Sequence, residues 1–237
     1  MTPIPPSAVL FLLQAGWPAN VVLPITLESI NGLRARQSAG ARQRAGNAGY
    51  YRVIELLTII QRAGAVGMRV ESDEGEQEAT VIVIRRENVP ADILAAEDEL
   101  AHLLGIRPDA SEYTVAYAEV PRNDTELAML TRSTLSIMVE LAGQVAVPPQ
   151  HVADGRTLPS LIDAGSAGDD LRRIIDIRSS EEKPDTAFVA VNYRDHWFWI
   201  DDRDFKSKRT FAYLMLLFSL TESGGKEGLP LVTIPAG

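Results

Sequence analysis

Apolar residues recur at helical spacing in five stretches before residue 146, and each stretch predicts a helix. The predicted helices span about 6–16, 18–36, 50–64, 88–105 and 123–143. Pro24 lies inside the second pattern and is expected to kink or divide that helix, because proline removes a backbone donor. Gly105 is placed for a left-handed cap at the end of the fourth helix. Asn123 and Glu126 have the spacing of a capping box and open the fifth.

Alternating or continuous runs of β-branched and aromatic residues predict strands. The predicted strands span about 68–71, 80–85, 113–120, 173–178, 187–193, 196–200 and 229–234. The first two flank a turn at Asp73–Gly75, and the fifth and sixth are joined by a tight turn at Arg194–Asp195. A further helix follows, capped by Asp202 or Asp204, with an apolar stripe at 211–218. Residues 34–49 and 147–168 predict loops, being rich in small and polar residues.

These elements predict an α+β fold in which helices pack on a mostly antiparallel sheet. Its C-terminal part is a three-stranded meander followed by a long helix. We expect one compact unit over 1–237, with two subregions, 1–146 and 169–237, joined by the loop at 147–168.

Composition narrows the functional classes. The chain has 237 residues, of which 46% are hydrophobic and 23% charged, as in ordinary globular proteins. Its formal net charge of −9 disfavours nucleic-acid binding, because phosphates are repelled. With no cysteine, thiolate metal sites, thiol nucleophiles and disulfides are excluded.

The early apolar run Ala8–Leu13 is too short to span a bilayer, and no basic residue precedes it as in a signal peptide. We therefore expect a soluble chain without a transmembrane segment. Its location would be the periplasm if a signal peptide has been removed, and otherwise the cytoplasm.

The densest polar chemistry follows the aromatic run His196–Trp199. Asp201, Asp202, Asp204 and Lys206 lie within six positions there, with His196 nearby. Carboxylates clustered in this way suit Mg²⁺ or Ca²⁺, which bind several oxygen ligands at once. The simpler interpretation is that the aspartates begin a helix, where a cap and negative charge are favourable.

A nuclease-like motif is also present in weak form. Pro184 and Asp185, followed by Asp204 and Lys206, have the residue types of the PD-(D/E)xK motif, in which two acids hold a metal. In that fold the second acid and the lysine belong to a strand, whereas here they fall in a predicted helical turn. The helix interpretation is therefore favoured.

Trp197 and Trp199 alternate with Phe198, so they are predicted to share one face of a strand. Core packing is the first interpretation. If that face is exposed, the two indoles are candidate interaction residues for a protein or a small ligand.

Four segments are distinctive in sequence, namely Arg194–Asp204, Ser207–Ala212, Ser29–Leu33 and Val147–Val152. They resemble a group of uncharacterised bacterial proteins, many of which look like lipid-anchored envelope proteins with a signal peptide that ends in cysteine. This chain lacks both that signal and the cysteine. The resemblance implies a place in the bacterial envelope and implies no chemistry.

We therefore predict a non-catalytic structural or protein-interaction protein without cofactor, whose partners are other proteins. The alternative is a metal-dependent, nuclease-like hydrolase that uses Asp201, Asp202, Asp204 and Lys206, with His196 nearby.

Overall fold

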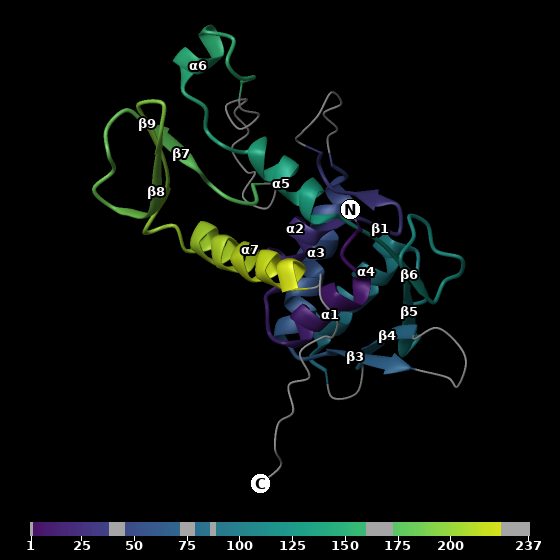
Figure 1. The fold of residues 1–237 in the computed structure, drawn as a ribbon. Coiled ribbons are helices and arrows are strands. Elements are labelled where there is room, and N and C mark those ends of the chain that lie inside the picture. The colour runs from purple at the N-terminus through teal and green to yellow at the C-terminus, as the bar shows by residue number, and fades with distance from the viewer. Residues whose placement is uncertain (1, 38–45, 72–78, 86–88, 160–172, 224–237) are drawn as a thin grey trace.

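The computed structural model describes residues 2–37, 46–71, 79–85, 89–159 and 173–223 (Figure 1). Over these residues it contains seven helices and nine strands, arranged as an α+β fold. The helices are α1 Pro6–Gln14, α2 Ala19–Thr26, α3 Ala48–Arg62, α4 Ala91–Leu104, α5 Thr134–Ala142, α6 Pro149–Ala153 and α7 Phe205–Ser223. The strands are β1 Leu27–Ile30, β2 Leu33–Arg34, β3 Val66–Glu71, β4 Ala79–Ile84, β5 Glu112–Ala116, β6 Glu126–Thr131, β7 Arg178–Ser180, β8 Ala187–Tyr193 and β9 His196–Asp201.

Six strands form the larger sheet, in the order β2-β1-β6-β5-β4-β3. Every neighbouring pair is antiparallel except β5 and β6, which run parallel. The remaining three strands form a second, antiparallel sheet in the order β7-β9-β8. The predicted α+β class, with helices on a mostly antiparallel sheet and a long helix after the C-terminal strands, is confirmed.

The larger sheet buries one of its faces under helices. Ile82 of β4 lies opposite Tyr113 of β5, and both side chains are buried. Glu112 and Thr114, the neighbours of Tyr113 on the other face, are exposed. Helix α1 contacts β3, β5 and β6, and α3 and α4 pack on each other beside it (Figure 1). Each apolar side chain buried between these layers contributes roughly 1.5–3 kcal/mol relative to its exposed state.

A single side chain holds the junction between the first two helices. The Gln61 amide donates to the carbonyls of Leu13 and Trp17, both at 2.9 Å, and its Oε1 accepts from the Ala19 N–H at 2.9 Å. These backbone groups belong to the end of α1 and the start of α2, where helical partners are lacking. Helix α3, which carries Gln61, thereby fixes the turn around Gly16, whose φ is +92°.

The second predicted helix is correct only as far as Thr26. Residues 27–34 form the β1–β2 hairpin instead of continuing to Arg36. Its turn is Asn31–Gly32, with φ of 45° and 80°, and an Asn-Gly pair with two positive φ angles is the strongest short-range hairpin signal. Pro24 lies inside the short α2, and its carbonyl accepts a hydrogen bond of 2.7 Å from Arg132.

The predicted helix over 123–143 is wrong in its first half. Asn123 Oδ1 accepts from the Thr125 N–H at 2.9 Å, and Glu126 Oε1 accepts from the Arg122 N–H at 3.2 Å. The residue types of a capping box here close a turn that leads into strand β6. The helix begins only at Thr134, where Ser133 Oγ accepts from the Ser136 N–H at 3.2 Å. Strand β6 lies between β1 and β5, and this position outweighs the helical propensity of its Leu, Ala and Met residues.

The C-terminal part also departs from the prediction at one strand. Residues 173–177 are not a strand, and β7 begins at Arg178. Ile174 is buried, and its N–H donates to Gln144 Oε1 at 2.7 Å. Thr210 Oγ1 of α7 donates to the Ile174 carbonyl at 3.1 Å, so this segment is held between α7 and the end of α5.

Helix α7 joins the smaller sheet to the core. It contacts α2, and Tyr213, Leu214 and Leu217 are buried in the same cluster as the N-terminal helices. The Tyr213 ring lies 5.2 Å from that of Trp17, measured between ring centroids. The smaller sheet itself lies to one side of the larger one (Figure 1).

The other predicted elements have definite outcomes. The helices over 6–16, 50–64 and 88–105, the hairpin of β3 and β4, and the strands β8 and β9 are confirmed. The strand predicted over 113–120 is confirmed as β5 only as far as Ala116, and residues 117–120 are not a strand. Gly105 is left-handed with φ of 64°, and Arg194 and Asp195 both have positive φ in their tight turn. The predicted loop over 147–168 contains the short helix α6. The turn at 73–75, the strand at 229–234 and residues 38–45 of the predicted loop at 34–49 lie outside the described residues.

The Asn31 side chain is expected to contribute strongly to stability. Its Nδ2 donates to the Leu104 carbonyl and its Oδ1 accepts from the Ala128 N–H, both at 2.8 Å. We expect Asn31→Ala to lower the free energy of unfolding by about 2–4 kcal/mol, since two backbone groups lose their partner and alanine disfavours positive φ.

Asn31→Gly separates the two contributions, because glycine tolerates the backbone. Its loss should be smaller than that of alanine by about 1 kcal/mol. Asn192→Ala, at an exposed position of β8, is the control and should change stability by less than about 0.5 kcal/mol. Urea denaturation measures all three, and equal stability of Asn31→Ala and the parent protein would contradict this role.

Candidate functional site

The three aspartates between the end of β9 and the start of α7, namely Asp201, Asp202 and Asp204, each have a separate partner. Asp201 Oδ2 pairs with the Arg178 guanidinium at 3.0 Å, and its Oδ1 accepts from the Arg203 N–H at 2.9 Å. Asp202 pairs with Lys208 at 2.7 Å. Asp204 Oδ1 accepts from the Ser207 N–H at 3.0 Å, which is the bond of a helix N-cap.

These carboxylates do not converge on a shared point. Among the described residues, no group of three or more His, Asp or Glu side chains could hold a metal ion. Asp204 and Lys206 stand at the start of α7 and not on a strand, while Asp185 is exposed in the loop before β8. This geometry lends no support to the nuclease-like alternative, since two acids and a lysine around one metal are what that chemistry needs.

The electrostatics of Asp204 fit its position at the helix start. Partial burial raises its pKa, but hydrogen bonds from the Ser207 hydroxyl and from the backbone N–H groups of Ser207 and Lys206 outweigh burial. The pKa of Asp204 therefore lies below its usual range. Its charge then stabilises the fold at neutral pH, and this contribution is lost as the pH falls through the lowered pKa.

The two predicted interaction residues, Trp197 and Trp199, lie side by side on one face of β9, and both are half-buried. The Trp199 Nε1–H donates to Ser180 Oγ at 3.1 Å. A cation lies over each ring, Arg178 at 5.3 Å from the Trp199 ring and Lys183 at 5.4 Å from the Trp197 ring. The indoles therefore form a layer with basic side chains and are neither core residues nor freely exposed.

Within the smaller sheet, the most exposed apolar side chains belong to strand β8. Phe188, Val191 and Tyr193 have exposed fractions of 44%, 59% and 56%. Strand β8 forms an edge of the smaller sheet, with β9 as its neighbour in that sheet. The strand pattern predicted β8 but not its exposure, because an apolar run reads equally as a buried strand.

A histidine pair links helix α6 to this sheet. The rings of His151 and His196 lie 4.8 Å apart between centroids, at an angle of 60°. His151 is buried, with 7% of its surface exposed. Burial, followed by the nearby His196, Arg156 and Arg194, lowers the pKa of His151, while Asp154 opposes this change. Sequence spacing gave no hint of the pair, because 45 positions separate the two residues.

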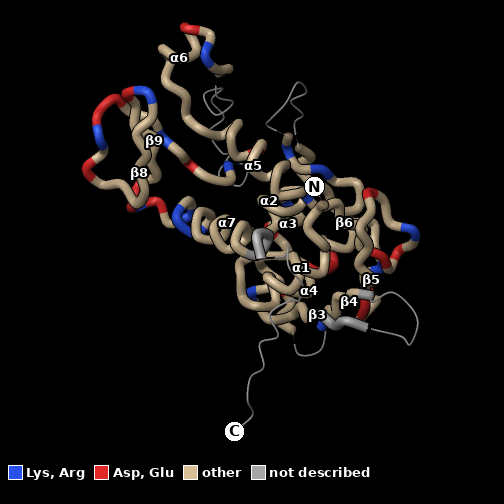
Figure 2. The backbone as a smooth tube through the Cα atoms, viewed as in Figure 1, with Lys and Arg blue, Asp and Glu red and all other residues tan. Residues whose placement is uncertain are grey.

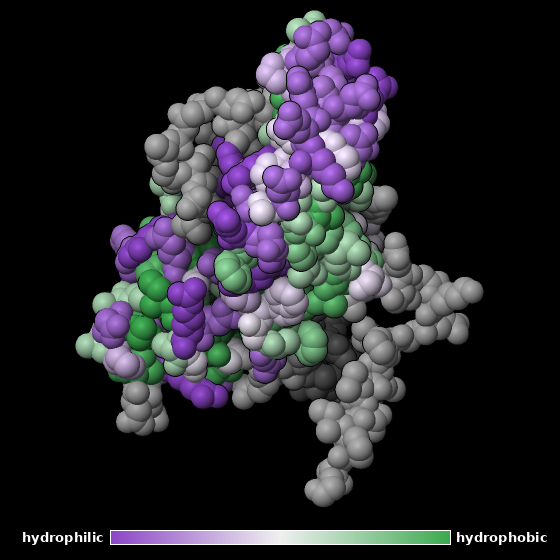
Figure 3. All heavy atoms as spheres, turned by 90° about the vertical axis from the view of Figure 1, so that its left-hand side faces the viewer, coloured by the Kyte–Doolittle hydropathy of each residue, from purple (hydrophilic) through white to green (hydrophobic). Residues whose placement is uncertain are grey.

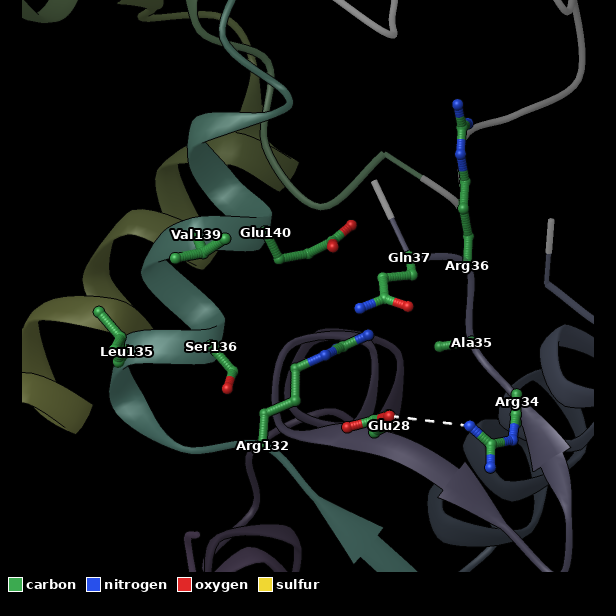
Figure 4. Close-up of a pocket in the computed structure, with 10 residues that line it drawn as sticks. All are labelled: Glu28, Arg34, Ala35, Arg36, Gln37, Arg132, Leu135, Ser136, Val139 and Glu140. Carbon is green, nitrogen blue, oxygen red and sulfur yellow. Dashed lines mark ion pairs between the residues drawn. The ribbon is translucent and has the colours of Figure 1, made fainter. Parts of the chain in front are cut away.

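A pocket of about 220 Å³ lies on another part of the surface, between α5, β1 and residues 34–37 (Figure 4). Its polar side chains are largely engaged in structural contacts. Arg132 is buried and donates to the carbonyls of Pro24 and Ile25, at 2.7 and 3.1 Å. Arg34 pairs with Glu119 and lies 4.0 Å from Glu28. The pocket is thus a junction where the end of α2 meets α5, and the described residues that line it include no nucleophile–base pair.

This pocket could not be foreseen from the sequence. Two incorrect predictions concern the segments that form the pocket: residues 27–34 were predicted to be part of a helix, and residues 123–143 were predicted to be one unbroken helix. Only the turn from β6 into α5 brings Arg132 and Glu140 to the same cavity.

Comparisons with protein-family models, with curated proteins and with solved structures find no match. Within the described residues, no helix has the length and apolar character needed to cross a membrane. The features that define the molecule are therefore its α+β fold and its partly exposed, aromatic smaller sheet.

Two substitutions test whether Asp204 acts as a helix cap or as a metal ligand. Asp204→Ala should lower the free energy of unfolding by about 1 kcal/mol, because the N-cap is lost. Asp202→Ala should lower it by less than about 0.5 kcal/mol, since its partner Lys208 forms a solvent-accessible pair.

Calorimetry with Mn²⁺ and Ca²⁺ completes this comparison, and we expect no binding by the parent protein or either variant. Binding by the parent protein that disappears in a folded Asp204→Ala variant would contradict the cap assignment.

The histidine pair predicts an acid-sensitive contact. A histidine whose pKa is lowered in the folded state loses stability as the pH falls below its unfolded pKa, because only the unfolded chain takes up the proton. Lowering the pH from about 7.5 to 5.5 should therefore lower the melting temperature.

His151→Phe should weaken this pH dependence while keeping an aromatic contact with His196. His102→Gln, at an exposed position of α4, is the matched control and should retain the full dependence. The assignment fails if His151→Phe and the parent protein lose the same stability on acidification.

Proposed function

We propose that this protein is a non-catalytic interaction protein and that its contact surface is the smaller sheet, β7-β9-β8. One observation carries the proposal, namely the exposure of Phe188, Val191 and Tyr193 on an edge strand. Large apolar side chains gathered on one exposed element are typical of sites that bind another protein.

The composition of β8 supports a partner that adds a strand. Residues 187–193 read Ala-Phe-Val-Ala-Val-Asn-Tyr, with no charged residue and no proline. Natural proteins usually protect an edge strand with charge, proline or a bulge, because its backbone groups otherwise pair with another chain. Strand β8 has a register shift only at its start, between Ala187 and Val189. An extended segment of a partner can therefore pair with its remaining length.

Charged residues surround this apolar strand. Acidic and basic residues lie in the loops at the ends of β8 and β9 and at the start of α7 (Figure 2). Seen from the side that carries these strands, the upper projection of the molecule is mainly hydrophilic, and hydrophobic patches lie below it (Figure 3). An apolar centre with a polar rim is the usual arrangement of a protein interface, where the rim contributes mainly to specificity.

The indoles supply the second component of the surface. Trp197 and Trp199 lie on the opposite face of the sheet from Val191, because Val191 is paired with Phe198. Tryptophan is enriched among residues that dominate binding energy, and the cations over both rings restrict their motion. A partner that adds a strand to β8 would extend both faces of the sheet at once.

The resemblance of Arg194–Asp204 to bacterial envelope proteins supports a place for this interaction in the envelope. That segment begins at the turn between β8 and β9 and ends at the cap of α7. It therefore coincides with one edge of the proposed surface.

A lysine on the edge strand tests the proposal. Tagged parent protein and Val191→Lys are used as bait in a lysate of the source organism, after cross-linking, and captured proteins are quantified by mass spectrometry. The introduced charge should reduce capture of the partner by at least about tenfold, equivalent to about 1.4 kcal/mol, because a buried charge would lack a partner.

Val120→Lys is the matched control. Val120 is also an exposed valine, with an exposed fraction of 66%, but it lies outside the smaller sheet. This variant should capture the partner as the parent protein does, and both variants should retain the parent melting temperature. Equal capture by Val191→Lys and Val120→Lys would exclude β8 as the contact surface.

A further inference from the structure

A second cavity, of about 100 Å³, lies in the core between the larger sheet and the N-terminal helices. Its walls come from elements far apart in the sequence, from α1 to β6. The lining residues include Leu13, Leu57, Val66, Ile82, Leu100 and Leu104.

The wall of this cavity has few polar groups, and those of Gln61 are already hydrogen-bonded to the backbone. Gln14 and Gln61 are the polar residues among the lining residues, and Gln14 is exposed at the surface. Both N–H groups of the Gln61 amide donate to carbonyls, of Leu13 and Trp17, and its oxygen accepts from Ala19. A buried water needs two to four polar partners, which this wall does not offer. The cavity is therefore suited to an apolar occupant.

A gap of this size is unusual in a protein core. Native interiors are packed as densely as organic crystals, and few of their voids exceed a water molecule. A cavity lined by Leu and Ile also reduces stability in proportion to its volume, because its wall lacks packing partners. A molecule that fills the space would restore these contacts.

We propose that this cavity binds a small, uncharged, apolar molecule. An engineered cavity of about 150 Å³, lined by similar side chains, stays dry and binds benzene. The present cavity is smaller, so its ligand is of benzene size or below. Gln14 is exposed and Leu13, Leu57 and Val66 are half-buried, which places the approach to the cavity beside α1, α3 and the start of β3.

Selectivity follows from the wall chemistry. Benzene needs no polar partner, whereas the hydroxyl of phenol would have to compete for the Gln61 amide, whose oxygen already accepts from the Ala19 N–H and whose N–H groups already donate to Leu13 and Trp17. An unpaired buried hydroxyl is strongly unfavourable. Benzene should therefore bind at least about tenfold more tightly than phenol.

Methyl NMR of the full chain tests the site with benzene as the probe. Benzene at millimolar concentration should shift the methyl signals of Leu57, Leu100 and Leu104 in a saturable manner, and phenol should shift them at least about tenfold less at equal concentration. No saturable shift with benzene, or equal binding of phenol, would overturn the proposal.

Two substitutions fill the cavity from different strands. Ile82→Phe and Val66→Phe each place a ring on the wall, and either one, once shown to be folded, should abolish the benzene shifts. Val83→Phe is the matched control, because Val83 lies opposite exposed Glu112 and its side chain points to the other face of the sheet. Benzene binding that persists in the filled variants, or that is lost equally in Val83→Phe, would place the ligand elsewhere and overturn the assignment.

Discussion

Burial of one face of the six-stranded sheet under α1, α3 and α4 is the constraint on which the rest of the structure depends. Helix α7 also packs into this core, through Tyr213, Leu214 and Leu217. Once that helix is docked, the smaller sheet is held beside the core but lies outside it. A small sheet needs a buried hydrophobic face or a helix packed against it to be stable. Its aromatic strands are thus ordered by α7 and by the Ile174 segment, while β8 stays exposed.

The parts of the fold that could be predicted are those in which local chemistry and tertiary environment agree. Gly105, the Arg194–Asp195 turn and the Asp204 cap each satisfy a backbone requirement that can be read from a few residues. The predictions that fail concern segments in which the local chemistry and the tertiary environment favour different structures. Asn123 and Glu126 bond to neighbouring backbone N–H groups as in a capping box, yet they close a turn. Strand β6 is set by its neighbours β1 and β5, which the local sequence does not contain.

The candidate site, like the fold, has features that the local sequence could predict and features that it could not. Asp204 could be assigned to a helix start, because the N-cap is a local interaction. The exposure of β8, the His151–His196 contact and the two cavities could not be predicted, since each depends on segments distant in the chain. An apolar run such as Ala187–Tyr193 has the same appearance whether it is buried or exposed. Only the strand order shows that β8 is an edge.

The order of strands also has a consequence for the nascent chain. Hairpin β1–β2 is joined to the sheet through β6, and Asn31 bonds to Ala128, 97 positions downstream. At roughly 5–20 residues per second, a ribosome delivers β6 several seconds after the hairpin has emerged. During that interval α1 lacks β6, one of the strands on which it packs. The first third of the polypeptide therefore completes its packing only after β6 has been synthesised.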